Sequence, residues 1–463
     1  MRLKKLAIAA GVAALTAGGL TLPLAGTASA ATALKDDYNG DGYRDLAIGT
    51  PKANAVTITY GSASGVTPAR SVTVTQETPG VPGVTEAEDE FGENVSSGDV
   101  NHDGYTDLIV GAPGEQVADW ASGSVTVVWG SAKGLTTGAQ VYHAPTEDDE
   151  RFGEGTVFVD LDGDDWAQLS VVSAKKWWWY GDGTPASAYA PEVEFIPSDV
   201  TLEGQTAAQF HGTGVGRTYT YVLYGKHADG RPYMGWVDGG AGDIGYYSGQ
   251  IDGNFTGSTT EAAATGDVNG DGYPDLVTGQ AEDNSIWIFY GGSSIFTDEM
   301  EGMHKITQDS TGVPGATETE DRFGASVAVG DLDADGFDDI AVGAPGETVS
   351  GVKGTGSVVV LKGRSGYDLD GRAYHQATTG VPGAAEAGDR FGSSVRFKDV
   401  NGDGRADLAI GASGEDIGTK ADAGAVTVLR GSSPYLTTSA VTSFNGADFG
   451  RPAAGISFGD VLR

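Results

Sequence analysis

The sequence contains no cysteine among its 463 residues, and histidine is scarce. The lack of cysteine excludes disulfide bonds, so an exported chain of this kind needs another cross-link, for which calcium is the candidate. The six histidines are scattered along the chain, at His102, His143, His211, His227, His304 and His375. The sequence shows no histidine-based zinc motif, nucleophile elbow or phosphate-binding glycine loop. No catalytic motif is recognised, and we do not predict an enzyme.

Positive charge is also scarce, because 28 Lys and Arg residues face 64 Asp and Glu residues, a formal net charge of −36. A chain so acidic repels phosphate backbones, and nucleic acid is not an expected partner. The acidity has two readings, solubility outside the cell or a preference for cationic ligands. Bound metal would neutralise part of it.

Long apolar runs are confined to the stretch from Leu6 to Leu24, which follows two lysines and precedes Ala28-Ser29-Ala30. This pattern predicts a secretory signal over residues 1–30, and a membrane anchor is the alternative. No later run reaches the roughly 20 apolar residues that a spanning helix needs. We therefore expect a secreted, extracellular monomer with no membrane span after signal cleavage.

Glycine is abundant, with 74 residues, but it follows no three-residue period. The glycines separate short strand-like runs such as Val56–Tyr60, Ser124–Val128 and Ser357–Leu361. Alternating short strands and turns predict an all-β protein.

One compound unit recurs along most of the chain. A Phe-Gly pair is followed by an acidic loop, a strand that ends in Gly-Ala-Pro, and a strand that ends in a bulky residue and Gly. The step from Phe to the first Asp of the loop is always eight residues: Phe91 to Asp99, Phe152 to Asp160, Phe323 to Asp331 and Phe391 to Asp399.

The repeats can be counted from the third strand of the unit, which is the one that ends in a bulky residue and Gly. It ends seven times, at Tyr60-Gly61, Trp129-Gly130, Tyr180-Gly181, Tyr224-Gly225, Tyr290-Gly291, Lys362-Gly363 and Arg430-Gly431. The fourth unit, about residues 191–253, is degenerate: it keeps this strand over Thr218–Tyr224 and lacks the acidic loop.

The two ends of the chain complete each other. The first unit begins directly at its loop, Asp37 to Asp45, and its missing Phe-Gly strand resembles the segment from Phe449-Gly450 to Asp460. Pairing of the N- and C-terminal segments would close a ring over residues 31–463 and leave no exposed sheet edge at the join.

These motifs, Phe-Gly, Gly-Ala-Pro and Asp-x-Asn-x-Asp-Gly-x-x-Asp, resemble the FG-GAP repeat family, known from the propeller head of integrin α subunits and from bacterial secreted proteins. The resemblance covers about residues 36–463. It implies a seven-bladed β-propeller of four-stranded blades, calcium in the loops between first and second strands, and roles in adhesion or recognition.

Five acidic loops carry the complete pattern. Carboxylates two residues apart in a tight loop can converge on calcium, which takes six to eight oxygens. The predicted ligands, with a main-chain carbonyl at the fourth member of each set, are Asp37, Asn39, Asp41, Tyr43, Asp45; Asp99, Asn101, Asp103, Tyr105, Asp107; Asp267, Asn269, Asp271, Tyr273, Asp275; Asp331, Asp333, Asp335, Phe337, Asp339; and Asp399, Asn401, Asp403, Arg405, Asp407. An EF-hand is excluded because position twelve is never Glu. The alternative is a turn without metal.

A sixth loop keeps Asp160, Asp162 and Asp164 but has Asp165 in place of Gly and Gln168 in place of the last Asp. We expect it to be a weak or vacant site. The aromatic run Trp177–Tyr180 could stack on sugars, but its position in the repeat favours packing within a sheet.

The sequence therefore predicts a secreted calcium-binding propeller that acts as a binding or adhesion module for an extracellular protein or glycan. Two alternatives stay open. One is a propeller hydrolase or lyase acting on polysaccharide or phosphoester, and the other is a structural envelope or matrix protein.

Overall fold

A computed structural model gives the fold. It describes residues 33–116, 122–135, 138–146, 150–160, 167–181, 184–185, 188–189, 196–210, 212–213, 216–217, 219–238, 247–250, 262–292, 303–366, 368–451 and 453–463. The predicted signal, residues 1–30, lies outside these ranges. Within them, no helix is long and apolar enough to span a membrane.

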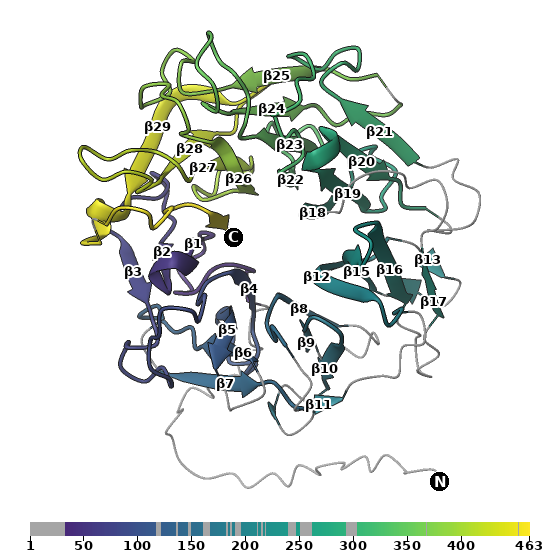
Figure 1. Cartoon of the computed structure of the whole chain (residues 1–463), viewed down its shortest axis with the longest axis vertical. Coiled ribbons are helices and arrows are strands. Elements are labelled where there is room, and N and C mark those ends of the chain that lie inside the picture. The colour runs from purple at the N-terminus through teal and green to yellow at the C-terminus, as the bar shows by residue number, and fades with distance from the viewer. Residues whose placement is uncertain are drawn as a thin grey trace, which may run out of the picture.

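Seven four-stranded antiparallel sheets surround a central axis, which confirms the predicted seven-bladed β-propeller (Figure 1). From the innermost strand outward, blade 1 holds β30 (Val461–Leu462), β1 (Leu46–Thr50), β2 (Ala55–Thr59) and β3 (Ser71–Val74); blade 2 holds β4 (Asn94–Gly98), β5 (Asp107–Gln116), β6 (Ser122–Val128) and β7 (Ala139–His143); blade 3 holds β8 (Gly155–Val159), β9 (Gln168–Val172), β10 (Trp177–Tyr180) and β11 (Ala188–Tyr189).

The remaining blades follow the same order. Blade 4 holds β12 (Val200–Ala208), β15 (Thr220–His227), β16 (Pro232–Asp238) and β17 (Tyr247–Gln250); blade 5 holds β18 (Ala262–Gly266), β19 (Asp275–Gln280), β20 (Ser285–Phe289) and β21 (Met303–Thr307); blade 6 holds β22 (Ser326–Gly330), β23 (Asp339–Ala344), β24 (Ser357–Leu361) and β25 (Gly371–Tyr374); blade 7 holds β26 (Phe391–Lys398), β27 (Asp407–Ala412), β28 (Ala425–Arg430) and β29 (Thr437–Asn445). Short 3-10 helices are η1 (Pro51–Ala53), η3 (Ala281–Asp283) and η5 (Gly446–Phe449).

The core lies between adjacent blades. The second strands β1, β19, β23 and β27 are buried along their whole length. Both faces of these strands are covered by neighbouring sheets, which explains why they read as continuous apolar runs and do not alternate. The clusters join consecutive blades, as where Ile410 and Phe391 pack with Val358 of blade 6.

The ring closes where the two chain ends meet, as the sequence predicts. Strand β30 pairs antiparallel with β1, with Ile48 opposite Leu462. The inner strand β30 also contacts β4 and β26, so the innermost strands form an unbroken circle. Full closure removes the exposed sheet edges that would otherwise pair with other chains.

One detail of the closure was predicted wrongly. Phe449 lies in η5, and Phe458-Gly459 takes the place of the Phe-Gly motif. A Cβ on Gly411 would lie 2.0 Å from the carbonyl oxygen of Gly459, just as a Cβ on Gly343 would lie 2.0 Å from that of Gly392. The true motif is recognised by this close backbone approach, which only the folded ring creates.

The fourth blade also differs from its predicted layout. Tyr224-Gly225 belongs to β15, the second strand of the blade and not the third. A two-stranded hairpin of β13 (Gly212–Thr213) and β14 (Gly216–Arg217) is inserted before it. The count of seven units was nevertheless correct, because β16 and β17 complete the sheet.

The aromatic run Trp177–Tyr180 forms β10 and packs inside the molecule, as the favoured interpretation held. Trp177 is 1% exposed, and its indole N–H lies 3.2 Å from the side-chain oxygen of Gln205 in the next blade. Trp178 and Tyr180 are buried in the cluster between blades 2 and 3. Three of the four aromatic side chains of the run therefore pack within or between blades, and Trp179 is half-buried.

Candidate metal centres

The five acidic loops occupy equivalent places in five blades. In blades 2, 5, 6 and 7 the loop runs from the end of the innermost strand to the start of the second strand. In blade 1 the loop over 37–45 leads into β1, because the innermost strand of that blade comes from the C-terminal end. The expected position between first and second strands is confirmed.

Each loop is folded by its own side chains. In the first loop, the Asp37 carboxylate accepts hydrogen bonds from the backbone N–H groups of Asp41 (3.1 Å) and Gly42 (2.8 Å), and Asn39 Oδ1 accepts from Asp41 N–H (2.8 Å). Gly42 has φ of 88°, a left-handed conformation that favours glycine. These hydrogen bonds hold the side chains at loop positions one and three against the backbone of the turn.

The same pattern recurs in the other loops. The carboxylates of Asp99, Asp267, Asp331 and Asp399 each accept N–H groups four and five residues further on. The repetition shows that the residue spacing folds the loop locally. The expected contribution of the carbonyls of Tyr43, Tyr105, Tyr273, Phe337 and Arg405 stays a prediction.

The last Asp of each loop is buried and fastens the loop to the blade. Asp45 accepts hydrogen bonds from the backbone N–H groups of Tyr38 (2.9 Å) and Gly61 (2.8 Å). Burial raises the pKa of Asp45 to about 7, although these two hydrogen bonds act in the opposite direction. Burial likewise raises the pKa of Asp107 and of Asp275 to about 7. A nearby cation would favour the ionised form of such a buried carboxylate.

Two loops bring three carboxylates close enough to share one ion. Ligand oxygens of Asp37, Asp41 and Asp45 lie within 4.8 Å of one another, and so do those of Asp331, Asp333 and Asp339. Oxygen donors of this kind fit a hard cation such as calcium. Among the described residues, the loops at 99–107, 267–275 and 399–407 do not bring three carboxylates within that distance.

A lysine lies among the carboxylates of blade 6. The ammonium of Lys362 is 2.8 Å from Asp339 Oδ1, 2.9 Å from Asp333 Oδ2 and 3.6 Å from Asp335 Oδ2. Its side chain is 7% exposed. Burial alone would lower the pKa of Lys362, but Asp339 and Asp333 outweigh it and raise the pKa, so the ammonium remains charged. A metal ion fits this loop only if Lys362 moves out.

Blade 7 holds a weaker version of the same arrangement. Arg430 Nη1 lies 3.1 Å from Asp407 Oδ2. Lys362 and Arg430 both occupy the position before the glycine that ends the third strand, where blades 1, 2 and 5 have Tyr60, Trp129 and Tyr290. In the sequence this position marks the repeat, and its change from aromatic to basic residues also signals two kinds of loop.

The sixth loop is only partly described. Asp160 is included in the structure, whereas Asp162 and Asp164 lie outside the described residues. The prediction of a weak or vacant site there stays a prediction.

Two further acidic groups were missed at the sequence level. They are Glu86, Asp89 and Glu115, and Glu318, Asp321 and Glu347. In each group a glutamine side chain donates a hydrogen bond to the glutamate. Gln76 donates to Glu115, and Gln308 donates to Glu347 at 2.6 Å. The signal was the spacing of 39 residues between Gln and Glu, which is the same in both pairs.

Comparison with known proteins agrees with this architecture. A family model described as FG-GAP repeat matches residues 30–67, 91–128, 259–289, 323–361 and 391–429. These are the five blades that carry the complete acidic loops.

Several curated proteins share part of the sequence. Integrin alpha-IIb of Homo sapiens is 34% identical over 167 residues, which are 33% of this chain and 14% of that protein. Integrin alpha-5 of Xenopus laevis is 32% identical over 184 residues, 37% of this chain and 16% of that protein. Phosphatidylinositol-glycan-specific phospholipase D of Dictyostelium discoideum is 28% identical over 196 residues, 40% of this chain and 20% of that protein.

The chain thus covers no more than a fifth of the length of these relatives. A solved structure of BBS1N in complex with ARL6DN aligns with a TM-score of 0.42 and 10% identity over 82% of this chain and 90% of that chain, a likeness too weak to carry an argument. Five blades of the seven-bladed ring thus match the FG-GAP repeat, and part of the chain is similar in sequence to integrin α chains. These similarities support a module of the binding or adhesion type.

Proposed function

We propose that this protein is a secreted, calcium-organised propeller that binds an extracellular protein or glycan. The observation that carries the proposal is the convergence of Asp37, Asp41 and Asp45 in a loop of an integrin-like FG-GAP blade. The similarity to integrin α chains supports an adhesive role and an extracellular location. The apolar stretch near the N-terminus supports export.

Calcium has a structural role in this proposal. Each loop crowds three or four acidic side chains beside the end of a strand, and a bound ion would offset their repulsion and hold the loop in shape. The loops at 99–107 and 267–275 bind calcium directly, and the loop at 37–45 binds it once the partly exposed Arg70 guanidinium, 2.6 Å from Asp41 Oδ2, moves aside. The loop at 331–339 binds calcium more weakly because Lys362 has to leave. The loop at 399–407 binds calcium with intermediate affinity because Arg430 contacts Asp407.

The calcium part is tested by isothermal titration calorimetry of the EDTA-treated, desalted full chain. Asp41→Asn removes a carboxylate from the first loop, and Asp309→Asn, at an acidic residue outside the acidic loops, is the matched control. We expect the first change to remove one binding site and the control to leave the number of sites unchanged. Equal stoichiometry in the Asp41→Asn variant and the wild type would contradict the assignment of that loop.

The binding role is tested separately on immobilised extracellular proteins and on a glycan array, each probed in millimolar calcium and in EDTA. We expect retention on at least one surface in calcium and loss of that retention in EDTA. Turnover of a polysaccharide or phosphoester panel, abolished by a single acidic substitution outside the five loops, would favour the hydrolase or lyase alternative.

A further inference from the structure

A cavity of about 260 Å³ lies on the axis of the ring. Its walls come from the innermost strands of all seven blades: β4, β8, β12, β18, β22 and β26, with the chain end that follows β30. Close contacts between consecutive innermost strands enclose it. The cavity is therefore the central channel of the propeller and belongs to none of the acidic loops.

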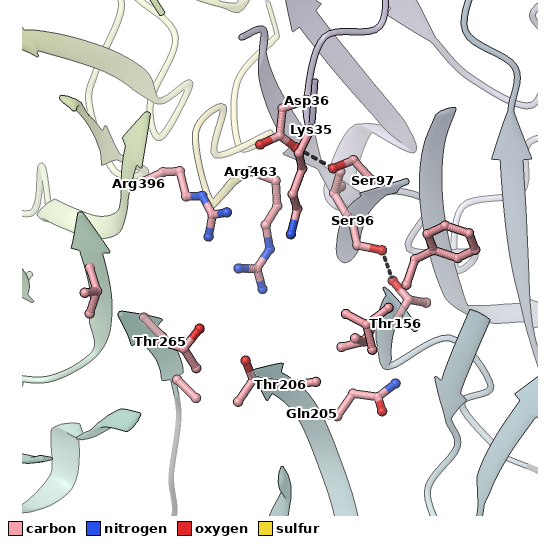
Figure 2. A pocket seen from close by; sticks show the side chains of 18 of the residues that line it. Lys35, Asp36, Ser96, Ser97, Thr156, Gln205, Thr206, Thr265, Arg396 and Arg463 are labelled. Atoms are coloured by element: carbon pink, nitrogen blue, oxygen red, sulfur yellow. Dashed lines mark hydrogen bonds between the residues drawn. The ribbon is translucent and has the colours of Figure 1, made fainter. Parts of the chain in front are cut away.

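Three basic side chains reach this channel from separate parts of the chain (Figure 2). Lys35 precedes the first loop, Arg396 lies on β26 and Arg463 follows β30. The backbone of Arg463 is fixed by two hydrogen bonds with Ala47, at 2.7 and 2.9 Å, and its side chain points into the opening. The ring closure itself thus places a guanidinium on the axis.

These cations have little counter-charge in the channel. Among the described residues that line the channel, Asp36 is the one acidic side chain. It is already engaged, because it accepts a hydrogen bond from Ser97 and lies 3.2 Å from the ammonium of Lys398. Burial would raise the pKa of Asp36, but Lys398 and Lys35 hold it well below its usual range. Arg396 Nε is buried and has no hydrogen-bond partner.

The rest of the channel wall carries hydroxyl groups among apolar residues. Ser96 and Thr156 lie 2.6 Å apart through their hydroxyls, and Thr206 and Thr265 line the facing side (Figure 2). The protons of Ser96 and Thr156 are already used, because Thr156 donates to Asn94 Oδ1 at 2.7 Å and Ser96 then donates to Thr156. The hydroxyls of Thr206 and Thr265 can donate hydrogen bonds to an anion. The channel thus combines three cations with hydroxyl groups in a protein whose formal net charge is −36.

Grouping like charges in this way is unfavourable without an anion. Burial, followed by the charge of Arg396, lowers the pKa of Arg463 to about 10. An anion between the three groups would remove the repulsion and satisfy their donors.

We propose that the central channel binds a tetrahedral oxyanion, a phosphate or sulfate group. Guanidinium groups match the oxygens of such anions in paired hydrogen bonds. The donors approach from three directions, and a tetrahedral group presents oxygens to all of them, whereas a carboxylate offers only two oxygens. The anion can be free or carried on a sugar, and the test below distinguishes these sources.

The test is calorimetric titration of sodium sulfate into the calcium-loaded full chain, with sodium chloride holding the ionic strength constant. A second arm uses glucose 6-sulfate as the probe. The variants are Arg396→Gln, Arg463→Gln and the double variant. Arg231→Gln is the control, because that guanidinium is on the surface, 67% exposed and paired with Asp229.

We expect one sulfate per chain, an affinity about tenfold weaker in each single variant, no saturable binding in the double variant and no change in the control. Tighter binding of glucose 6-sulfate than of sulfate identifies a carried group, and the reverse order identifies the free ion. No saturable heat with either probe, or equal affinity in the wild type and the double variant, would overturn the proposal.

If a variant shows no binding heat, thermal melting in two buffers distinguishes a lost anion site from a damaged fold. In chloride buffer, loss of one of the three like charges should preserve or raise the melting temperature, whereas in sulfate buffer the same variant should melt below the wild type. Lys35→Gln supplies a third variant outside any strand. A variant that melts lower than the wild type by the same amount in both buffers would contradict an anion site.

Discussion

Replacing Lys362 by Met tests whether this lysine acts as a built-in cation. Met keeps an unbranched side chain of similar length and removes the charge, which leaves Asp333, Asp335 and Asp339 without their ammonium partner. Removing one partner of a buried ion pair costs about 3–5 kcal/mol. The unfolding entropy of a 463-residue chain is about 1 kcal/mol per degree, so the melting temperature in EDTA should fall by about 3–5 °C.

Calcium should rescue this variant more than it stabilises the wild type. With Lys362 gone, the ligand oxygens of Asp331, Asp333 and Asp339 lie within 4.8 Å of one another with no ammonium among them, and calcium can enter this loop without displacing Lys362. At a calcium concentration a thousand times the Kd, binding contributes about 4 kcal/mol, enough to restore the loss. Calorimetry should count one additional strong calcium site per chain in the variant.

Lys353→Met is the matched control for this experiment. Lys353 lies in the same blade, in an exposed loop, and forms no ion pair among the described residues. The control should melt within about 1 °C of the wild type in both buffers. The reasoning is refuted if Lys362→Met melts like the wild type in EDTA, or if calcium adds neither stability nor a site to it.

Three further predictions concern the whole ring. Burial raises the pKa of Asp45, Asp107 and Asp275 from 3.8 to about 7, so the calcium-free folded protein holds protons that the unfolded chain releases between about pH 4 and 7. Its free energy of unfolding should therefore decrease as the pH rises through this window, by on the order of 4 kcal/mol per carboxyl. Urea melts in EDTA should show greater stability at pH 5 than at pH 8, and equal or lower stability at pH 5 would refute this. Excess EDTA should lower the melting temperature of the wild type relative to millimolar calcium, and an unchanged midpoint would contradict a structural role for the ions. Gly343→Ala should destabilise the fold by about 2–3 kcal/mol, because the new Cβ would lie 2.0 Å from the carbonyl oxygen of Gly392, while Gly292→Ala, whose Cβ meets nothing within 4 Å, should not change the melting temperature.

Much of the candidate site was predictable because it is local. The spacing Asp37, Asn39, Asp41 and Asp45 folds its own loop through side-chain to backbone hydrogen bonds within nine residues. Because the same spacing recurs in five blades, both the loops and their position before the second strands could be predicted from the sequence. Non-local partners were not readable: Lys362 reaches Asp339 only because adjacent strands of blade 6 bring together residues that lie 23 positions apart.

The sequence by itself determined that the chain is all-β, that it repeats seven times and that its ends complete one blade, since each of these properties follows from turn residues, period and the order of motifs. The tertiary structure alone decided that Phe458-Gly459 closes the ring, because that motif is defined by backbone contact with Gly411 across blades. It alone also placed Lys35, Arg396 and Arg463 around one cavity. Lys35 lies hundreds of positions before Arg396 and Arg463, which are themselves 67 positions apart, and only the closed circle of innermost strands puts their charges within reach of one another.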